Sequence, residues 1–197
     1  MDSELACLQQ QHTLSLVPLP YDKNVVGCKW VFKIKRDSNG NIARYKARLM
    51  AKGYLQQYGL DYAKTFSPVV KPATIRIVLA LAVQFGWSLK QLDVSNAFLH
   101  GVLQEEVYMC QLLGYKDSLR PDHVCLLHKA IYGLKQSPRA WFDNFTTQLF
   151  HLGFHASYAN TNLFILIHSS HIVYLLLYVD DIIITGNNSP FITEIVS

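Results

Sequence analysis

Two adjacent carboxylates, Asp180 and Asp181, lie between two apolar runs near the end of the sequence, at 171–179 and 182–185. Apolar runs of this length predict buried strands, and the short polar break between them predicts a tight turn. The two aspartates are therefore expected at the tip of a β-hairpin. Because their neighbours are as apolar as the core of a sheet, we expect this tip to face a cleft.

Carboxylates that crowd together in a cleft need a cation, and their hard oxygens suit Mg²⁺. Two such ions about 3.5–4 Å apart would stabilise the attacking and the leaving oxygen of an in-line phosphoryl displacement. Asp93, at the end of an apolar strand expected over 87–94, is the candidate third ligand. The alternatives are an acidic turn that only solubilises a hairpin and, for Asp93, a cap on the turn that follows. The aspartates alone leave both open.

Composition limits the class of protein. With 197 residues, of which 50% are apolar and 16% charged, the chain is expected to be globular, as one core or one domain of two lobes. Its four cysteines have no CxxC spacing, which argues against a zinc site or a disulfide framework and favours a reducing compartment. The polar start is unlike a signal peptide, and polar residues interrupt the apolar stretch 165–184, so we expect an intracellular, cytoplasmic protein without a membrane span.

Positive charge is concentrated in one segment. Residues 23–52 hold nine basic side chains and one acidic side chain, Asp37, although the formal charge of the whole chain is only +4. Two strands are expected there, over 25–36 and 42–51, joined by a turn at Asn39-Gly40. Such a basic hairpin beside an acidic, metal-competent segment is typical of a protein that grips a polyanion. The alternative is a solvated face on a surface hairpin.

The remaining elements are expected from periodicity and from helix start and stop signals. Thr74 is expected to cap a helix over 75–85 that ends at Gly86 and is buried, because nearly all its faces are apolar. A second helix is expected from Pro138 to Leu152, with Gly153 as its stop. Further expected elements are a helical turn at 5–11, a strand at 106–110, a loop at 114–121, and antiparallel strands at 162–167, 171–179 and 182–185.

Five segments in order make the sequence recognisable: RYKARLMAKGY at 44–54, KTFSPVVKPATIRIVLALA at 64–82, QLDVSNAFLHG at 91–101, AIYGLKQSPRAWF at 130–142 and YVDD at 178–181. Together they closely resemble the reverse transcriptase of copia-type LTR retrotransposons, which is part of the Pol polyprotein. The resemblance runs from about Val17 to Gly186. Five motifs are far more specific than an isolated YVDD.

The resemblance implies an α+β fold with the fingers and palm of a right-hand polymerase, in which an antiparallel palm sheet packs on helices. The expected division is a lead-in over 1–24, fingers over 25–86 and 102–137, and palm over 87–101 and 138–197. The palm is expected to be incomplete and the thumb absent, because the sequence stops 16 residues after Asp181. Such a C-terminally truncated chain should hold primer-template weakly.

The implied activity is RNA-directed DNA polymerisation, a nucleotidyl transfer to a primer 3′-hydroxyl in retrotransposon replication. Asp93, Asp180 and Asp181 would be both catalytic residues and ligands of two Mg²⁺ ions, with Mn²⁺ as a possible substitute. The implied partners are an RNA or DNA template-primer, deoxynucleoside triphosphates and, if the reading frame is complete, the thumb and RNase H domains of Pol. In an active element the location would be a virus-like particle.

The resemblance also implies binding residues. Phe98 would be an aromatic gate that clashes with a 2′-hydroxyl, and the alternative for it is core packing. The loop 133–138 would close the nucleotide site, although it could equally be an ordinary lead-in to a helix. Lys46 and Arg48 would meet the triphosphate or, with Lys52, track the template backbone. The full expected sets are Lys46, Arg48, Ala97, Phe98, Tyr132 and Gly133 for the nucleotide, and Lys33, Lys35, Lys52, Lys135, Gln136 and Tyr178 for nucleic acid.

Several positions depart from the family pattern, although none of them removes a catalytic carboxylate. They are Leu14 in place of tryptophan, Val102 in place of an acid, Leu112-Leu113 in place of two prolines and Asn160 in place of aspartate. Relaxed constraint of this kind keeps two alternatives open: a catalytically inactive nucleic-acid-binding remnant of a retrotransposon, and a structural relic with no partner.

Overall fold

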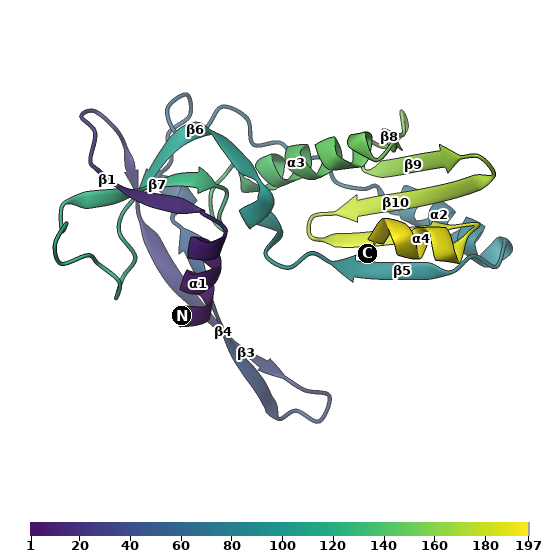
Figure 1. Cartoon of the computed structure of the whole chain (residues 1–197), viewed down its shortest axis with the longest axis horizontal. Coiled ribbons are helices and arrows are strands. Elements are labelled where there is room, and N and C mark those ends of the chain that lie inside the picture. The colour runs from purple at the N-terminus through teal and green to yellow at the C-terminus, as the bar shows by residue number, and fades with distance from the viewer. Residues whose placement is uncertain (197) are drawn as a thin grey trace. The chain divides into compact units, whose positions relative to one another are not determined.

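The computed structural model describes residues 1–196 and shows a mixture of helices and strands, as expected for an α+β fold (Figure 1). Two compact units can be distinguished. The first unit comprises Met1–Phe66 and Phe98–Trp141, and the second comprises Ser67–Ala97 and the chain from Phe142 onward. Each unit is therefore made of two separate segments of the chain. The division into fingers and palm stays a prediction.

The second unit is built on an antiparallel sheet of five strands in the order β5-β11-β10-β9-β8. The apolar runs around the paired aspartates form a hairpin, as the sequence predicted. The strands are β5 (Leu89–Asp93), β8 (His155–Ala156), β9 (Leu163–His168), β10 (His171–Tyr178) and β11 (Asp181–Gly186).

Helices cover both faces of this sheet. On one face, Phe164, Leu177 and Ile184 are buried together with residues of α3 (Ser137–His151) and α4 (Ser189–Val196). On the other face, Leu176 packs with Val78 of α2 (Pro72–Gln84). Because side chains alternate between the two faces of a strand, each apolar strand contributes to both cores.

Helix α2 differs from its prediction in two ways. Only Val78 and Ala82 are buried, whereas Val83 is 84% exposed, so one face of this apolar helix lies open in the structure. The helix begins after Lys71 with Pro72 in its first turn, and Thr74 does not cap it. The Thr74 hydroxyl instead accepts a hydrogen bond from Asn160 Nδ2 at 3.0 Å. The predicted stop is confirmed, because the helix ends just before Gly86, whose φ is +64°.

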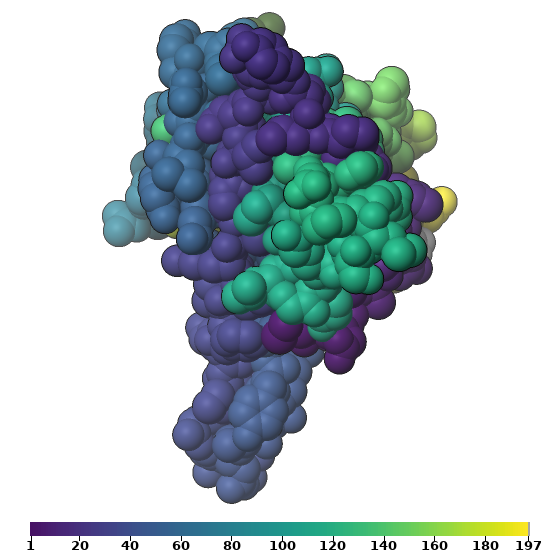
Figure 2. Space-filling view, turned by 90° about the vertical axis from the view of Figure 1, so that its left-hand side faces the viewer, coloured from purple at the N-terminus to yellow at the C-terminus, as the bar shows by residue number. Residues whose placement is uncertain are grey.

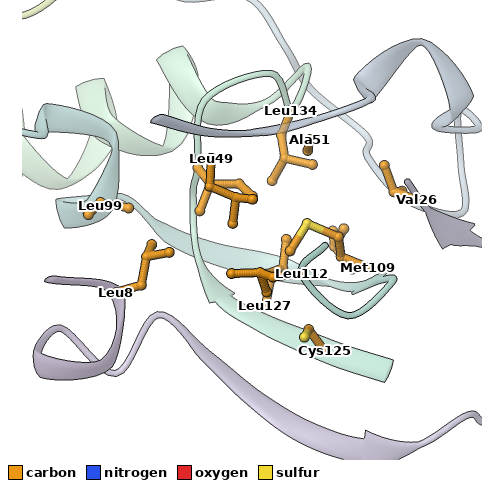
Figure 3. Close-up of a cluster of buried hydrophobic side chains, with 12 residues drawn as sticks. Leu8, Val26, Leu49, Ala51, Leu99, Met109, Leu112, Cys125, Leu127 and Leu134 are labelled. Atoms are coloured by element: carbon orange, nitrogen blue, oxygen red, sulfur yellow. The ribbon is translucent and has the colours of Figure 1, made fainter. Parts of the chain in front are cut away.

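The first unit holds a four-stranded sheet in the order β1-β7-β6-β2. Its core joins α1, the sheet and the end of β4 (Ile42–Ala51), and Figure 3 shows Leu8, Leu49 and Leu127 from three different elements in this cluster. The elements are α1 (Asp2–Gln10), β1 (Leu14–Pro18), β2 (Val25–Val26), β6 (Val102–Met109), β7 (His123–Lys129), the 3-10 helix η1 (Gly53–Leu55) and the 3-10 helix η2 (Ala97–His100), which crosses the boundary between the units.

The basic hairpin consists of β3 (Cys28–Arg36) and β4 (Ile42–Ala51) and stands out from the rest of the first unit (Figures 1 and 2). The sequence predicted one strand over 25–36, but the structure divides it. Val25 and Val26 form β2, which pairs in parallel with β6, and the hairpin begins after Gly27. The strand was predicted as one piece because its apolar and basic residues give no sign of a change of partner.

Among residues 1–196, no helix has the length and apolar character needed to cross a lipid bilayer.

Candidate active site

The paired aspartates lie at the tight turn between β10 and β11. Tyr178 and Asp181 face each other across the hairpin, so Val179 and Asp180 alone form the turn. Val179 has a φ of +55°, a left-handed conformation that a β-branched residue rarely adopts. Such a residue costs about 1–3 kcal/mol and persists only where its surroundings enforce it. The two apolar strands enforce the turn and thereby fix the backbone at Asp180.

Asp93 comes to the same place from a different part of the chain. It pairs with Asp181 across β5 and β11, and the backbone N–H of Val94 donates to the carbonyl of Asp180 at 2.9 Å. Residues directly opposite in an antiparallel pair point to the same face, and like charges there destabilise a sheet. Asp93 is exposed, and Asp180 and Asp181 are half-buried. The structure thus brings together the backbone of all three predicted catalytic residues.

Gln91 is a further member of this site that the sequence analysis missed. Its side-chain Nε2 donates to Oδ1 of Asp181 at 3.2 Å. Gln91 lies two residues before Asp93 on β5, so both side chains point to the same face. That spacing was the available signal, but it becomes informative only when β11 is known to be the neighbour of β5.

Three carboxylates are the kind of ligand that Mg²⁺ prefers. In the part of the chain that the structure describes, however, no three or more His, Cys, Asp or Glu side chains are arranged to hold a metal ion. Carboxylate oxygens suit Mg²⁺, and the strand register brings the three aspartates to one end of the sheet. Their side chains are not arranged to surround a metal ion in this structure. Metal binding by Asp93, Asp180 and Asp181 therefore stays a prediction.

The basic hairpin of the first unit pairs like charges with each other. Lys33 faces Lys46, and Lys35 faces Arg44. With Arg48, these residues lie on one face, because they occupy alternate positions of two paired strands. Directly opposed like charges destabilise a hairpin unless an ion of opposite charge is bound. Polyanion binding by this face stays a prediction.

The surroundings of Lys46 lower its pKa. Burial is the largest cause that lowers the pKa of Lys46, followed by the positive charges of Arg48 and Arg44. Both causes disfavour the charged ammonium, and a bound anion would counteract them. Lys46 is thus placed where a phosphate group would stabilise it.

Arg48, Tyr132 and Phe98 pack against one another in the first unit. The guanidinium carbon of Arg48 lies 4.6 Å from the centre of the Tyr132 ring, and the Phe98 and Tyr132 rings are also 4.6 Å apart, tilted by 56°. Arg48 Nε is buried and has no hydrogen-bond partner among the described residues. Three of the predicted nucleotide-binding residues therefore lie together.

Glycines allow the loop after β7 to approach β4 closely. The backbone N–H of Ala51 donates to the carbonyl of Tyr132 at 2.8 Å. A Cβ atom on Gly133, whose φ is +95°, would lie 2.1 Å from the carbonyl oxygen of Ala51. A Cβ atom on Gly53 would lie 2.0 Å from the carbonyl oxygen of Gly133. No larger residue fits at either position without movement of the backbone.

Gln136 is buried, although we expected it to contact nucleic acid. It is only 2% exposed, it accepts from Gln56 at 2.9 Å, and it donates to the carbonyl of Asp61 at 2.8 Å. Because both ends of its amide are used inside the protein, Gln136 has no open surface for the nucleic-acid contact that we expected. Ala97 is likewise fully buried, so its side chain offers no surface to a nucleotide.

The other residues expected at nucleic acid are at least partly accessible. Lys33 and Lys35 are exposed, Tyr178 is 50% exposed, and Lys52 is half-buried. The ammonium of Lys135 contacts the Tyr62 hydroxyl at 3.1 Å and lies over the Tyr62 ring. None of these positions conflicts with a contact to a polyanion.

Comparison of the sequence with known proteins identifies its family. Residues 11–197 match the family described as reverse transcriptase (RNA-dependent DNA polymerase). The chain belongs to this family. It is 54% identical over 190 residues to the retrovirus-related Pol polyprotein from transposon RE2 of Arabidopsis thaliana, and 53% identical over 189 residues to that from transposon RE1.

A third relative is the Pol polyprotein from transposon TNT 1-94 of Nicotiana tabacum, at 41% identity over 196 residues. These matches cover 95–99% of the chain, and the relatives confirm the copia-type resemblance. The chain spans only 13% of the RE2 and RE1 polyproteins and 15% of the TNT 1-94 polyprotein.

Replacement of Gly133 tests the close approach of the two backbone segments. Gly133→Ala should lower the free energy of unfolding of the first unit by about 3 kcal/mol, because backbone strain adds to a steric clash. Gly59→Ala is the matched control, since Gly59 also has a positive φ but nothing lies within 4 Å of its Cβ position. It should cost about 1–2 kcal/mol.

Urea unfolding followed by tryptophan fluorescence measures both changes. A Trp87→Phe background leaves Trp30 and Trp141, both in the first unit, as the signal. Equal losses in the two variants would contradict a specific clash at Gly133.

Proposed function

We propose that this chain catalyses template-directed transfer of deoxynucleotides to a primer 3′-hydroxyl. The single observation that carries the proposal is the pairing of Asp93 with Asp181 beside the strained turn that holds Asp180. The three carboxylates lie at the ends of two adjacent strands and in the turn that precedes one of them, and a bound cation would offset their mutual repulsion. Membership of the reverse transcriptase family supports a catalytic role for them.

The second unit would act as the palm. Asp93, Asp180 and Asp181 would hold two Mg²⁺ ions, or Mn²⁺ in their place, which when bound stabilise the attacking and leaving oxygens of phosphoryl transfer. Gln91 would orient the Asp181 carboxylate through its hydrogen bond, and the Val94 N–H would fix the backbone at Asp180. A displacement of about 1 Å can cost on the order of 10²-fold in rate, so this backbone pairing matters.

The first unit would act as the fingers. Arg48 can contact phosphate oxygens with a planar, forked set of donors, and Lys46 can do so as a point charge. Tyr132 packs on both Arg48 and Phe98 and would hold these side chains in place. Phe98 would exclude a ribose by contact with its 2′-hydroxyl. Gly133 would let the backbone of its loop approach the nucleotide.

The exposed basic face of the hairpin would bind the template-primer, with Lys33 and Lys35 on the backbone phosphates. Lys52, Lys135 and Tyr178 are the further candidates for this contact. RNA and DNA are both possible templates, since phosphate contacts carry no sequence information. The other Pol domains of a transposon polyprotein would be the partners of this chain in replication.

A second candidate function is nucleic-acid binding without catalysis. It is favoured by the like-charged pairs of the hairpin, which support binding of a polyanion whether or not the carboxylates are active. A single set of samples can separate the two functions, because primer extension and template binding can be recorded together.

The first test is primer extension on an RNA template with Mg²⁺, repeated with Mn²⁺. Asp180→Asn and Asp181→Asn should each reduce extension on the order of 10²-fold or more, because each removes a negative charge that would hold the Mg²⁺ ions. Asp122→Asn, at an exposed position of the first unit, is the matched control and should extend as the parent does. Template binding without extension by the parent would favour the second candidate.

The second test concerns the basic hairpin. The triple variant Lys33→Gln, Lys35→Gln, Arg44→Gln should bind single-stranded RNA more weakly. The slope of its log affinity against log salt should fall by about 2, since three phosphate contacts are lost. The control variant Lys64→Gln, Arg76→Gln, Lys116→Gln removes the same charge from exposed positions elsewhere. If both variants lose the same affinity, net charge and not the hairpin governs binding.

The third test concerns the proposed gate. Phe98→Ala should increase the incorporation of ribonucleotides relative to deoxynucleotides in single-nucleotide extension, because the ring that would meet the 2′-hydroxyl is gone. Phe98→Tyr keeps the ring and should keep the discrimination. An unchanged ratio in Phe98→Ala would leave Phe98 as a packing residue for Tyr132 only.

A further inference from the structure

Two cysteines that are far apart in the sequence meet in the first unit. The Sγ atoms of Cys28 and Cys110 are 3.6 Å apart, and both residues are half-buried. Cys28 is the first residue of β3, and Cys110 directly follows β6. The sequence showed no CxxC spacing, so nothing in it indicated this pair.

Neighbouring contacts hold the two segments together. The backbone N–H of Cys110 donates to the carbonyl of Val26 at 3.0 Å. The indole N–H of Trp30 donates to the carbonyl of Leu113 at 3.0 Å, and the Trp30 ring lies 6.1 Å from the Tyr115 ring. The two sulfurs are therefore neighbours because of the fold around them and not through a chance side-chain orientation.

The thiols differ in their surroundings. Burial, and after it the hydrogen bond with Cys110, raises the pKa of Cys28 to about 12. The Cys28 thiol also points toward the carbonyl oxygens of Cys110 and Gln111, at 3.8 and 3.9 Å. Cys28 is thus a protonated thiol at neutral pH that can donate to the Cys110 sulfur. Cys125 is buried in the core, which raises its pKa to about 11.

We propose that Cys28 and Cys110 form a reversible intrachain disulfide when the chain meets a peroxide. The Cys110 sulfur attacks one peroxide oxygen, the O–O bond breaks, and Cys110 sulfenic acid and one water form. The Cys28 sulfur then attacks the Cys110 sulfur and expels hydroxide, which leaves as a second water with the Cys28 proton. Two thiols lose two electrons, and one hydrogen peroxide is reduced to two waters.

The geometry permits this bond with a small movement. A disulfide needs a sulfur separation of about 2.05 Å, so the two sulfurs must approach by about 1.5 Å. Each cysteine lies at the end of a strand, where side chain and backbone can adjust.

The disulfide would fix the base of the basic hairpin to the end of β6. It would also close a long loop of chain, and cross-links of long loops stabilise a fold mainly by restricting the unfolded chain. The midpoint of thermal unfolding of the first unit should therefore rise on the order of 5–10 °C upon oxidation. The proposal involves residues of the first unit alone and does not depend on the proposed polymerase activity.

Peptide mapping of the oxidised chain tests the proposal, because trypsin places each cysteine on a separate peptide. After treatment of the full chain with hydrogen peroxide and capping of free thiols, mass spectrometry should find peptide 24–29 linked to peptide 91–116. Dithiothreitol should release the two peptides. The linked species and the rise in midpoint should be absent in Cys28→Ser and in Cys110→Ser, and present in Cys7→Ser.

Other outcomes would overturn the proposal. They are a link from peptide 91–116 to peptide 117–129, which carries Cys125, a link between chains, or oxidation of Cys110 to the sulfinic acid with Cys28 still free. Because the linkage is read from the parent chain, a serine variant that fails to fold does not prevent the test.

Discussion

The register between β5 and β11 is the constraint on which the candidate active site depends. Ile182 and Ile184 are buried on one face of the sheet, and Asp181 and Asp93 share the opposite face. Side chains alternate along a strand, so a slip by one residue would turn Asp181 into the core and two isoleucines toward α2. The cost of that exchange fixes the pairing. The apolar residues around the aspartates, which perform no chemistry, thus determine where the carboxylates point.

In the first unit the corresponding constraint is the absence of a side chain at two positions. Gly53 and Gly133 bring two backbone segments into a contact that no Cβ atom could enter. The segment that follows Gly133 is then held by Gln136 and Gln56, whose amides hydrogen-bond to each other inside the protein. The packing of Tyr132 on Arg48 and Phe98 depends on this contact, because Tyr132 directly precedes Gly133 and its carbonyl pairs with Ala51.

The sequence predicted those features that depend on neighbours along the chain. The β10–β11 hairpin, the turn of the basic hairpin and the stop of α2 at Gly86 follow from apolar runs, an Asn-Gly pair and a glycine. It failed where the deciding partner is distant in sequence. Periodicity cannot identify the neighbours that bury Gln136, bond Gln91 to Asp181 or bring Cys28 to Cys110. It also cannot tell which face of the apolar helix α2 stays exposed.

Each unit places residues of like charge opposite each other, negative in the second unit and positive in the first. Asp93 faces Asp181 in the second unit, and in the first unit Lys33 faces Lys46 and Lys35 faces Arg44. The lowered pKa of Lys46 shows which charge state folding disfavours there. Burial is the largest cause of this shift, followed by the positive charges of Arg48 and Arg44. Since the folded chain holds this proton less tightly than the unfolded chain, the penalty on the charged ammonium persists at neutral pH and is relieved only as the pH rises through the lowered pKa. Each like-charged pair weakens the sheet that carries it. Oppositely charged ligands, a cation for the aspartates and a polyphosphate for the lysines, would remove both costs, and a nucleotidyl transferase requires these two ligands together.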